Sequence, residues 1–290
     1  MDQARLNRPL AVLGAGIMGH GIAHAALAAG YTTRLYDVST MQAEQASDLI
    51  AGIIAQSVAL GKVTPSQAAA LQARLTTTTS LPEAVAGAGV IVEAAPERMD
   101  LKLALLADVQ ASAPADAVIV SNTSALSLTD LAVVLDCPGR IGGMHFFNPV
   151  HKMKLVEIVR ALETSDDTVE VMTAVAAAMG KETVLIRESP GFITSRINAL
   201  IGNEAFYMLQ EGVASARDID KALKLGLNHP MGPFALVDLV GLDTRLSILR
   251  YLHRTLGEKF RPCPLLEQHV AAGRLGRKTG RGVYDYEPPA

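Results

Sequence analysis

The sequence has no tryptophan, and aromatic side chains make up only 4% of its 290 residues. Proteins that bind single-stranded nucleic acid stack bases on aromatic rings, so this scarcity argues against that class. The formal net charge of −3 also lacks the cationic excess that a broad nucleic-acid-binding face requires. We therefore expect no nucleic acid among the partners of this protein.

Cysteine and long hydrophobic runs are scarce as well. The two cysteines, Cys137 and Cys263, do not indicate a disulfide framework and favour a reducing compartment. No uninterrupted apolar run approaches the ~18 residues of a membrane span. Residues 1–8 are polar and of mixed charge, without the apolar core of a signal peptide. These features predict a cytoplasmic protein with no membrane partner.

A glycine-rich turn follows the first predicted strand. Residues 9–13 read as a short apolar strand, residues 17–29 as an alanine-rich helix, and a second strand over residues 32–36 ends at Asp37. Between the first strand and the body of the helix lie Gly14, Ala15, Gly16, Ile17, Met18 and Gly19. This GxGxxG run between strand and helix, followed by an acid, is typical of dinucleotide binding.

Each part of this pattern has a physical reason. Gly14 allows a tight turn, Gly16 lets the backbone approach a pyrophosphate, and Gly19 lets helix and strand pack closely. The helix N-terminus then faces the phosphates. Asp37 can accept hydrogen bonds from a ribose and would repel a 2′-phosphate, which favours NAD over NADP. The alternative is a structural turn that binds no ligand.

The rest of the chain indicates two domains, as its length suggests. Strands are predicted at residues 75–78, 90–94, 117–121 and 140–145, with helices at 39–60, 65–74 and 100–112. This alternation predicts a Rossmann-type, doubly wound, mainly parallel sheet with an inserted helical hairpin over residues 1–186. Residues 187–290 read as an all-α domain, with helices at 192–210, 216–225, 233–240, 244–256 and 264–272.

Ligands of such sheets bind at the carboxyl ends of the strands. Those ends supply Ala94 to Glu97, Ser121 to Ser124, and His145 to Asn148. His145 follows a hydrophobic strand and Glu157 arrives on the next one, a pattern typical of an oriented general base. A buried histidine satisfied by a neighbouring acid is the structural alternative.

Several motifs together resemble the L-3-hydroxyacyl-CoA dehydrogenases, and the length is most similar to the bacterial 3-hydroxybutyryl-CoA members of that family. The resemblance covers nearly the whole chain. The matching runs are residues 14–19 (GAGIMG), 92–95 (VEAA), 121–124 (SNTS), 145–149 (HFFNP), 189–192 (SPGF), 228–233 (NHPMGP) and 276–282 (GRKTGRG).

The resemblance implies roles for individual residues. His145 matches the general base and Glu157 the acid that orients it, while Ser121 and Asn148 match residues that touch substrate and nicotinamide. The further cofactor contacts that it implies are Ala94, Ala95, Glu97, Lys102 and Lys278. Ser57 and Lys62 lie in the inserted hairpin about where the family meets coenzyme A, and a solvated hairpin face is the alternative for both.

The implied reaction interconverts (S)-3-hydroxyacyl-CoA, for example 3-hydroxybutyryl-CoA, and 3-oxoacyl-CoA with NAD. The resemblance also implies a homodimer formed through the helical domain. One position departs from the family, because Ser195 stands where a catalytic-site asparagine is frequent. Two other readings stay open: a dehydrogenase of a non-thioester hydroxy acid such as a sugar acid, and a nucleotide-binding structural protein without turnover.

A metal site is not expected. His20 and His24 are spaced as a metal-binding pair on the first helix, but the sequence places no third ligand near them.

Overall fold

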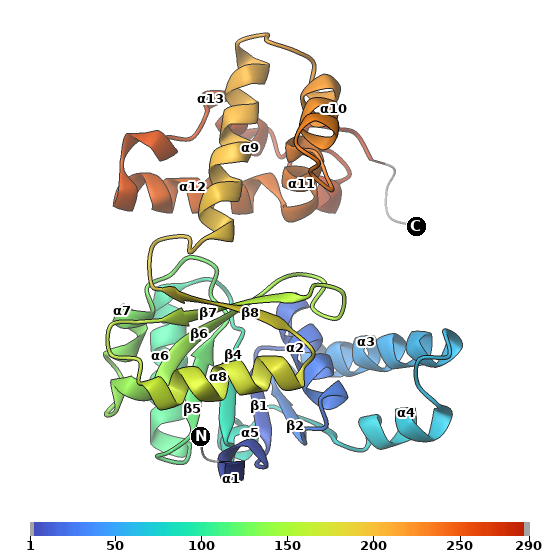
Figure 1. Cartoon of the computed structure of the whole chain (residues 1–290), viewed down its shortest axis with the longest axis vertical. Coiled ribbons are helices and arrows are strands. Elements are labelled where there is room, and N and C mark those ends of the chain that lie inside the picture. The colour runs from blue at the N-terminus through green and yellow to red at the C-terminus, as the bar shows by residue number, and fades with distance from the viewer. Residues whose placement is uncertain (1–2, 287–290) are drawn as a thin grey trace. The chain divides into compact units, whose positions relative to one another are not determined.

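The computed structural model describes residues 3–286, and the chain divides into two compact units, residues 1–188 and 189–290 (Figure 1). Each unit encloses its own cluster of buried hydrophobic side chains. The division lies two residues beyond the predicted boundary. The first unit extends this far because Glu188 still donates its backbone N–H to the carbonyl of Arg160 in the sheet.

The first unit is built on one eight-stranded sheet in the order β3-β2-β1-β4-β5-β6-β7-β8. The strands are parallel from β3 to β6, β7 is antiparallel to β6, and β8 is parallel to β7. Their bounds are Leu10–Leu13 (β1), Thr33–Tyr36 (β2), Leu75–Thr78 (β3), Val90–Glu93 (β4), Val118–Ser121 (β5), Ile141–Phe146 (β6), Leu155–Arg160 (β7) and Glu182–Arg187 (β8). The predicted doubly wound fold is confirmed.

Helices cover this sheet, and every side chain of β1, β4 and β5 is buried. Burial on both faces is what a central parallel strand requires, and it explains why these strands are almost wholly apolar. The helices of the unit are Gln3–Leu6 (α1), Ile17–Ala28 (α2), Thr40–Ala59 (α3), Pro65–Gln72 (α4), Leu81–Val85 (α5), Met99–Ser112 (α6), Leu128–Ala132 (α7) and Asp166–Ala178 (α8), with a 3₁₀ turn at Pro138–Arg140 (η1).

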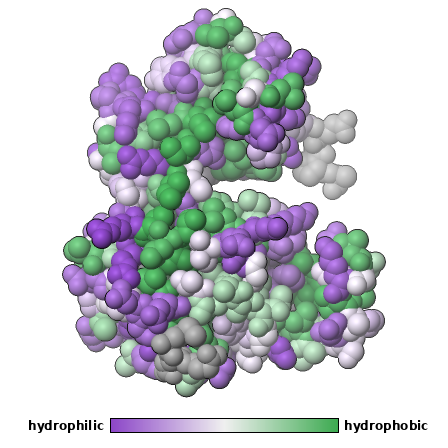
Figure 2. Space-filling model, in the orientation of Figure 1, coloured by the Kyte–Doolittle hydropathy of each residue, from purple (hydrophilic) through white to green (hydrophobic). Residues whose placement is uncertain are grey.

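Helices α3 and α4 form the predicted helical hairpin between β2 and β3. Helix α3 buries only four side chains, those of Ala43, Ala46, Ile50 and Ile54, and α4 buries none. Hydrophobic side chains also reach the surface of the hairpin, since Met41, Leu49 and Leu60 are 60%, 53% and 62% exposed (Figure 2). The hairpin is therefore an amphipathic appendage that contributes little to the core.

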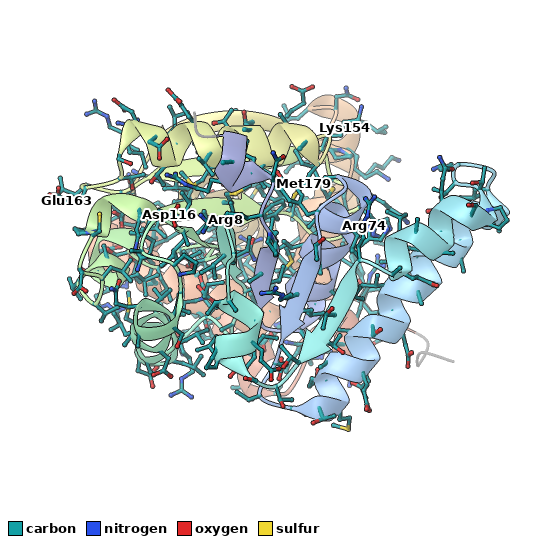
Figure 3. The ribbon with its side chains drawn as sticks, turned by 90° about the horizontal axis from the view of Figure 1, so that it is seen from below. Arg8, Arg74, Asp116, Lys154, Glu163 and Met179 are labelled. Carbon is teal, nitrogen blue, oxygen red and sulfur yellow. The ribbon has the colours of Figure 1, made fainter. Side chains whose placement is uncertain are left out.

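A salt bridge ties two strands together at the amino-terminal end of the sheet. Arg8, just before β1, contacts Asp116, just before β5, at 2.7 Å (Figure 3). The hydrogen bond from Arg8 holds the pKa of the Asp116 carboxyl below its ordinary value. The same guanidinium donates to the carbonyl of Gly87, before β4. This end of the sheet is fastened by side chains, which leaves the opposite end for ligands.

The second unit is helical, as predicted. Its helices are Thr194–Gln210 (α9), Ala216–Gly226 (α10), Pro233–Val240 (α11), Leu242–Leu256 (α12) and Pro264–Ala271 (α13), with 3₁₀ turns at Glu258–Phe260 (η2) and Arg277–Thr279 (η3). Phe206 and Phe234 stack edge to face in its core, with centroids 5.2 Å apart.

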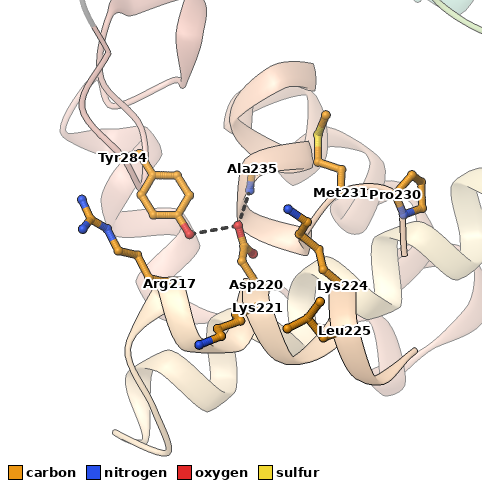
Figure 4. A pocket seen from close by; sticks show the side chains of 10 residues that line it. Arg217, Asp220, Lys221, Lys224, Leu225, Pro230, Met231, Ala235 and Tyr284 are labelled. Carbon is orange, nitrogen blue, oxygen red and sulfur yellow. Dashed lines mark hydrogen bonds between the residues drawn. The ribbon is translucent and has the colours of Figure 1, made fainter. Parts of the chain in front are cut away.

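Buried Asp220 on α10 holds α11 in place within this unit. Its carboxylate accepts hydrogen bonds from the N–H groups of Phe234 and Ala235 and from the hydroxyl of Tyr284 (Figure 4). It thus caps the start of α11 from another helix, where a negative charge is favourable. Burial, reinforced by this bond, raises the pKa of Tyr284.

In the described part of the chain, no helix combines the length and apolar character needed to cross a lipid bilayer.

Candidate functional site

Two of the three fingerprint glycines are required by close backbone contacts, and the third is open to its surroundings. Gly14 has φ +107°, and a Cβ there would lie 2.7 Å from the carbonyl oxygen of Ala94. A Cβ on Gly19 would lie 1.7 Å from the carbonyl oxygen of Gly14, so only glycine lets α2 pack on the turn. A Cβ on exposed Gly16 would meet no protein atom within 4 Å. The backbone at Gly16 is thus open to a ligand, and that position suits a pyrophosphate.

The start of α2 is also suited to an anion. Gly16 is its N-cap and supplies no side-chain hydrogen bond to the first turn. The N–H groups of that turn and the positive end of the helix dipole therefore lie at an uncapped terminus. Ile17 in the same turn is 68% exposed, and Met18 is half-buried.

Asp37 lies beside this turn, as the sequence predicts. One carboxylate oxygen accepts the N–H of Ala15 at 2.9 Å, and the other accepts the N–H of Ser39 at 3.0 Å. These two bonds fix an acidic side chain next to the fingerprint, at the end of β2. The residues present therefore fit an adenine dinucleotide: open backbone for its phosphates and a carboxylate for its ribose.

His145 and Glu157 form a buried pair across two antiparallel strands. They are directly opposite in the register of β6 and β7, so their side chains share one face of the sheet. Nδ1 of His145 lies 2.6 Å from a carboxylate oxygen of Glu157, and the two residues are 5% and 0% exposed. The carboxylate holds the proton on Nδ1, which makes Nε2 the basic nitrogen of the ring. The pair has the geometry of an oriented general base.

Asn148 lies in the loop after β6, and its side chain is exposed. This loop packs on α2, since a Cβ on Gly21 would lie 2.9 Å from the Val150 side chain. Lys181 donates to the carbonyls of Val150 and Met153 and so fixes the loop from the other side. The loop that carries Asn148 is thus held between α2 and the start of β8.

Two histidines meet where α2 and this loop touch. The rings of His24 and His151 pack edge to face, with centroids 6.2 Å apart, and Nδ1 of His24 is buried without a hydrogen-bond partner. Burial lowers the pKa of His24 to about 4, with further lowering by His151, His20 and Lys181. Within residues 3–286 no group of three or more histidine, cysteine or acidic side chains is arranged to hold a metal ion.

A second buried acid, Glu93, lies at the end of β4. The family resemblance includes it in the run 92–95 but implies no role for it. Glu93 is fully buried and accepts the ammonium of Lys102 and the N–H of Ala95, both at 2.6 Å, on one oxygen. Its other oxygen accepts the hydroxyl of Ser121 at 2.5 Å. The sequence does contain a signal for this residue, because Glu93 ends an apolar strand. A charge buried at that position needs a hydrogen-bonding or charged partner.

Glu97 holds the turn that follows β5. One of its oxygens accepts the hydroxyl of Thr123 at 2.6 Å and the N–H groups of Ser124 and Ala125 at 2.9 and 3.2 Å. Its other oxygen lies 3.6 Å from the ammonium of Lys102. The Glu97 side chain is 43% exposed, whereas Lys102 is only 1% exposed and is enclosed by Glu93, Glu97 and the carbonyl of Ala95.

Ser121 is more deeply buried than Ser124, the other serine of its run. Its side chain is 0% exposed, and its hydroxyl donates to Glu93, because the last residue of β5 points into the sheet unit. Ser124, three residues further on, is the hydroxyl of the same run that is half-exposed. Contact of Ser121 with a ligand stays a prediction, and Ser124 lies nearer the surface in the same turn.

The two hairpin residues lie together at the end of α3. The hydroxyl of Ser57 donates to the carbonyl of Ile53, and the carbonyl of Ser57 accepts the N–H of Lys62. Lys62 is exposed. A half-buried hydroxyl and an exposed ammonium thus share one corner of the hairpin.

Ser195 and Lys278 belong to the helical unit. Ser195 is half-buried in the first turn of α9. Lys278 in η3 is exposed, and its ammonium lies 2.7 Å from the carboxylate of Asp243. That contact contributes to lowering the pKa of Asp243 against the opposing effect of its burial.

Comparison with known proteins shows the family of this chain. The family model described as "3-hydroxyacyl-CoA dehydrogenase, NAD binding domain" matches residues 9–189, and the one described as "3-hydroxyacyl-CoA dehydrogenase, C-terminal domain" matches residues 191–286. A probable 3-hydroxybutyryl-CoA dehydrogenase of Bacillus subtilis is 44% identical over 97% of this chain and 98% of its own length.

Further relatives give the same answer. A 3-hydroxybutyryl-CoA dehydrogenase of Bradyrhizobium diazoefficiens is 41% identical over 98% of this chain and 97% of its own length. The crystal structure of (S)-3-hydroxybutyryl-CoA dehydrogenase from Ralstonia eutropha matches with a TM-score of 0.93 and 41% identity, covering 97% of this chain and 99% of that one. The chain belongs to the 3-hydroxyacyl-CoA dehydrogenase family and is an oxidoreductase.

Proposed function

We propose that the protein interconverts (S)-3-hydroxybutyryl-CoA and acetoacetyl-CoA with NAD as the hydride carrier. The observation that carries this proposal is the buried pair of His145 and Glu157, with 2.6 Å between Nδ1 and the carboxylate. Relatives called 3-hydroxybutyryl-CoA dehydrogenases, which align with this chain over nearly its full length, support the substrate class.

His145 is the general acid and base of the proposed reaction. In the oxidation direction, Nε2 takes the proton of the substrate 3-hydroxyl, and the same nitrogen returns it in the reduction direction. Glu157 keeps the ring in the required tautomer and stabilises the imidazolium that forms. When bound, NAD supplies the acceptor for the hydride that leaves C3.

The other polar residues position the substrate and the cofactor. Asn148, exposed after β6, is proposed to hold the reacting oxygen or the nicotinamide amide. Ser121 is proposed to touch the substrate and the nicotinamide, with half-exposed Ser124 beside it in the same turn. Ser195 is proposed to donate one hydrogen bond to the substrate, and Lys278 and Glu97 to contact the cofactor.

Cofactor and thioester specificity are assigned to different parts of the first unit. Asp37 is proposed to select NAD over NADP by repelling a 2′-phosphate. Ser57 and Lys62 are proposed to bind the coenzyme A moiety, because a cation beside an apolar hairpin surface suits its phosphates and adenine. We also propose that the protein acts in the cytoplasm and forms a homodimer through its helical unit.

The test compares substrates and one variant. NADH oxidation is followed with acetoacetyl-CoA, with longer 3-oxoacyl-CoA esters and with free 3-oxo acids, and NAD reduction is followed with sugar acids. We expect turnover with the thioesters and little with the free acids. Turnover with free acids alone would replace the proposal with a non-thioester dehydrogenase, and no turnover with any of these substrates would indicate a binding protein.

His145→Gln tests the general base in the same assay. We expect kcat to fall by about 10³-fold or more, because proton transfer by a positioned base typically contributes 10²–10⁴-fold. NADH binding, measured by fluorescence titration, is expected to stay close to the wild-type value, since His145 is assigned to the proton of the substrate. A variant that retains turnover would overturn this role.

A further inference from the structure

We propose that Glu93 is a positioning residue for the proposed reaction, acting through Ser121 and Lys102 to set the shape of the turn at residues 121–126. The inference rests on the proposed function for its kinetic readout only. Its structural basis is a network of buried hydrogen bonds that joins the carboxyl ends of three strands.

Glu93 joins the first two of these strands. It ends β4, and its register partner in β5 is Ser121. With one oxygen it accepts the hydroxyl of Ser121, and with the other it accepts Ala95 N–H and the Lys102 ammonium. Because an ionised carboxylate only accepts, the Ser121 proton points to Glu93, and the Ser121 oxygen can accept the N–H of Thr123, which lies 3.3 Å away. Glu93 therefore fixes Ser121, the first residue of the turn, from the side of the sheet.

Glu97 fixes the far side of the same turn through the hydroxyl of Thr123 and the N–H groups of Ser124 and Ala125. Lys102 lies between the two acids, 2.6 Å from Glu93 and 3.6 Å from Glu97. One ammonium thus serves two carboxylates. Without Glu93, the lysine would remain buried with only the partly exposed Glu97 as a counter-charge.

Asn122 extends the network to the third strand. Its side-chain oxygen accepts the N–H of Phe146 at 2.9 Å, and Phe146 directly follows His145 in β6. The turn that Glu93 shapes therefore touches the backbone beside the proposed general base. A small displacement of the turn would move Ser124 and the His145 backbone together, and displacements of about 1 Å can cost about 10²-fold in rate.

A buried acid with a lysine partner could also serve stability alone. Such pairs contribute little net stability compared with apolar residues of similar size, and removal of one partner is strongly destabilising. The tests therefore need a measurement that does not change when the protein is only destabilised. They also need a control variant at a buried acid in another part of the chain. Asp220 in the helical unit is that control, because it is buried and also accepts three hydrogen bonds, from two backbone N–H groups and one hydroxyl. It differs from Glu93 in having no lysine partner among these three bonds.

The first experiment compares Glu93→Gln, Lys102→Met, the double variant Glu93→Gln/Lys102→Met, Ser121→Ala and Asp220→Asn in the full chain. For Glu93→Gln we expect kcat with acetoacetyl-CoA to fall by at least about tenfold, with NADH affinity within about threefold of wild type. The double variant should recover the melting temperature lost by either single variant, but it should not recover kcat. Ser121→Ala should also lower kcat, and Asp220→Asn should lose stability without that loss.

The second experiment does not depend on catalysis. Amide hydrogen exchange of the 121–126 segment reports the N–H groups of Ser124, Ala125 and Leu126, which are bonded to Glu97 and Thr123. We expect faster exchange in Glu93→Gln and Ser121→Ala, and no change in Asp220→Asn. If the wild type lacks thioester turnover but the exchange result holds, the proposed function fails and the positioning of the turn stands. If exchange is unchanged, or if the double variant regains kcat with its stability, the role of Glu93 is wrong.

Discussion

At the scale of single residues, the hydrogen bonds of Asp37 fix its side chain, whereas its charge is proposed to discriminate between cofactors. Both carboxylate oxygens are occupied by N–H groups of the chain, so the side chain is fixed before any ligand arrives. Asparagine keeps one of these acceptors and removes the charge. The charge itself remains available to discriminate between a ribose hydroxyl and a ribose phosphate.

We therefore expect Asp37→Asn to raise the ratio of kcat/KM for NADPH to that for NADH by about tenfold or more, which corresponds to ~1.4 kcal/mol. The measurement is steady-state oxidation of each cofactor with acetoacetyl-CoA. Asp48→Asn is the control, because Asp48 is an exposed acid on α3 with the same charge and no role in the fingerprint. An unchanged ratio in Asp37→Asn would show that another feature sets the cofactor preference.

The sequence predicted best those helices and strands whose hydrophobic pattern or turn residues are recognisable within a short stretch of chain. The first strand, the fingerprint turn and α2 follow from neighbouring residues, and the predicted strand at residues 75–78 agrees with β3. The short helices α1, α5 and α7 were not predicted, because four or five residues are too few to show a helical period.

The polar residues at strand ends were harder to assign. Glu157 and Glu93 both lie on wholly or largely buried strands. The sequence predicted that Glu157 meets His145, but only the folded structure shows that Glu93 meets Lys102 on α6. Sequence distance does not reveal such pairs. Likewise, the run from Ser121 to Ser124 offers two serines, and which one faces inward depends on where β5 ends.

Acid sensitivity is expected at the contact between α2 and the loop after β6. The pKa of His24 is lowered in the folded protein to about 4, while the unfolded chain has the ordinary value near 6.5. The unfolded state thus binds a proton first as the pH falls. Stability is full above pH ~6.5 and decreases toward pH ~4, by roughly 1–2 kcal/mol once screening of this partly exposed ring is included.

His24→Gln removes this titration, and the neighbouring groups His20, His151 and Lys181 remain. We expect thermal unfolding of the variant to be less sensitive to a change from pH 7.5 to pH 5 than unfolding of the wild type. His253→Gln on α12 is the control and should behave as the wild type does. An equal drop in melting temperature for all three proteins would show that His24 does not contribute.

At the scale of the whole molecule, the helical unit exposes more apolar surface than its own core explains. Seven large hydrophobic side chains in its described part are between 42% and 76% exposed: Ile193, Ile197, Val213, Leu225, Leu227, Leu239 and Val240. Large exposed apolar side chains gather at association sites, and a second copy of the chain is the partner that we propose.

We expect sedimentation or light scattering at micromolar concentration to give the mass of a dimer for the wild type. Glutamate substitutions of Ile197, Leu225 and Leu239, each tested separately, place a charge on three different helices or their ends. At least one should shift the mass toward the monomer while circular dichroism stays unchanged, because an unpaired charge buried at an interface is costly. A monomeric wild type would contradict the proposed homodimer, and three dimeric variants would exclude this surface as its interface.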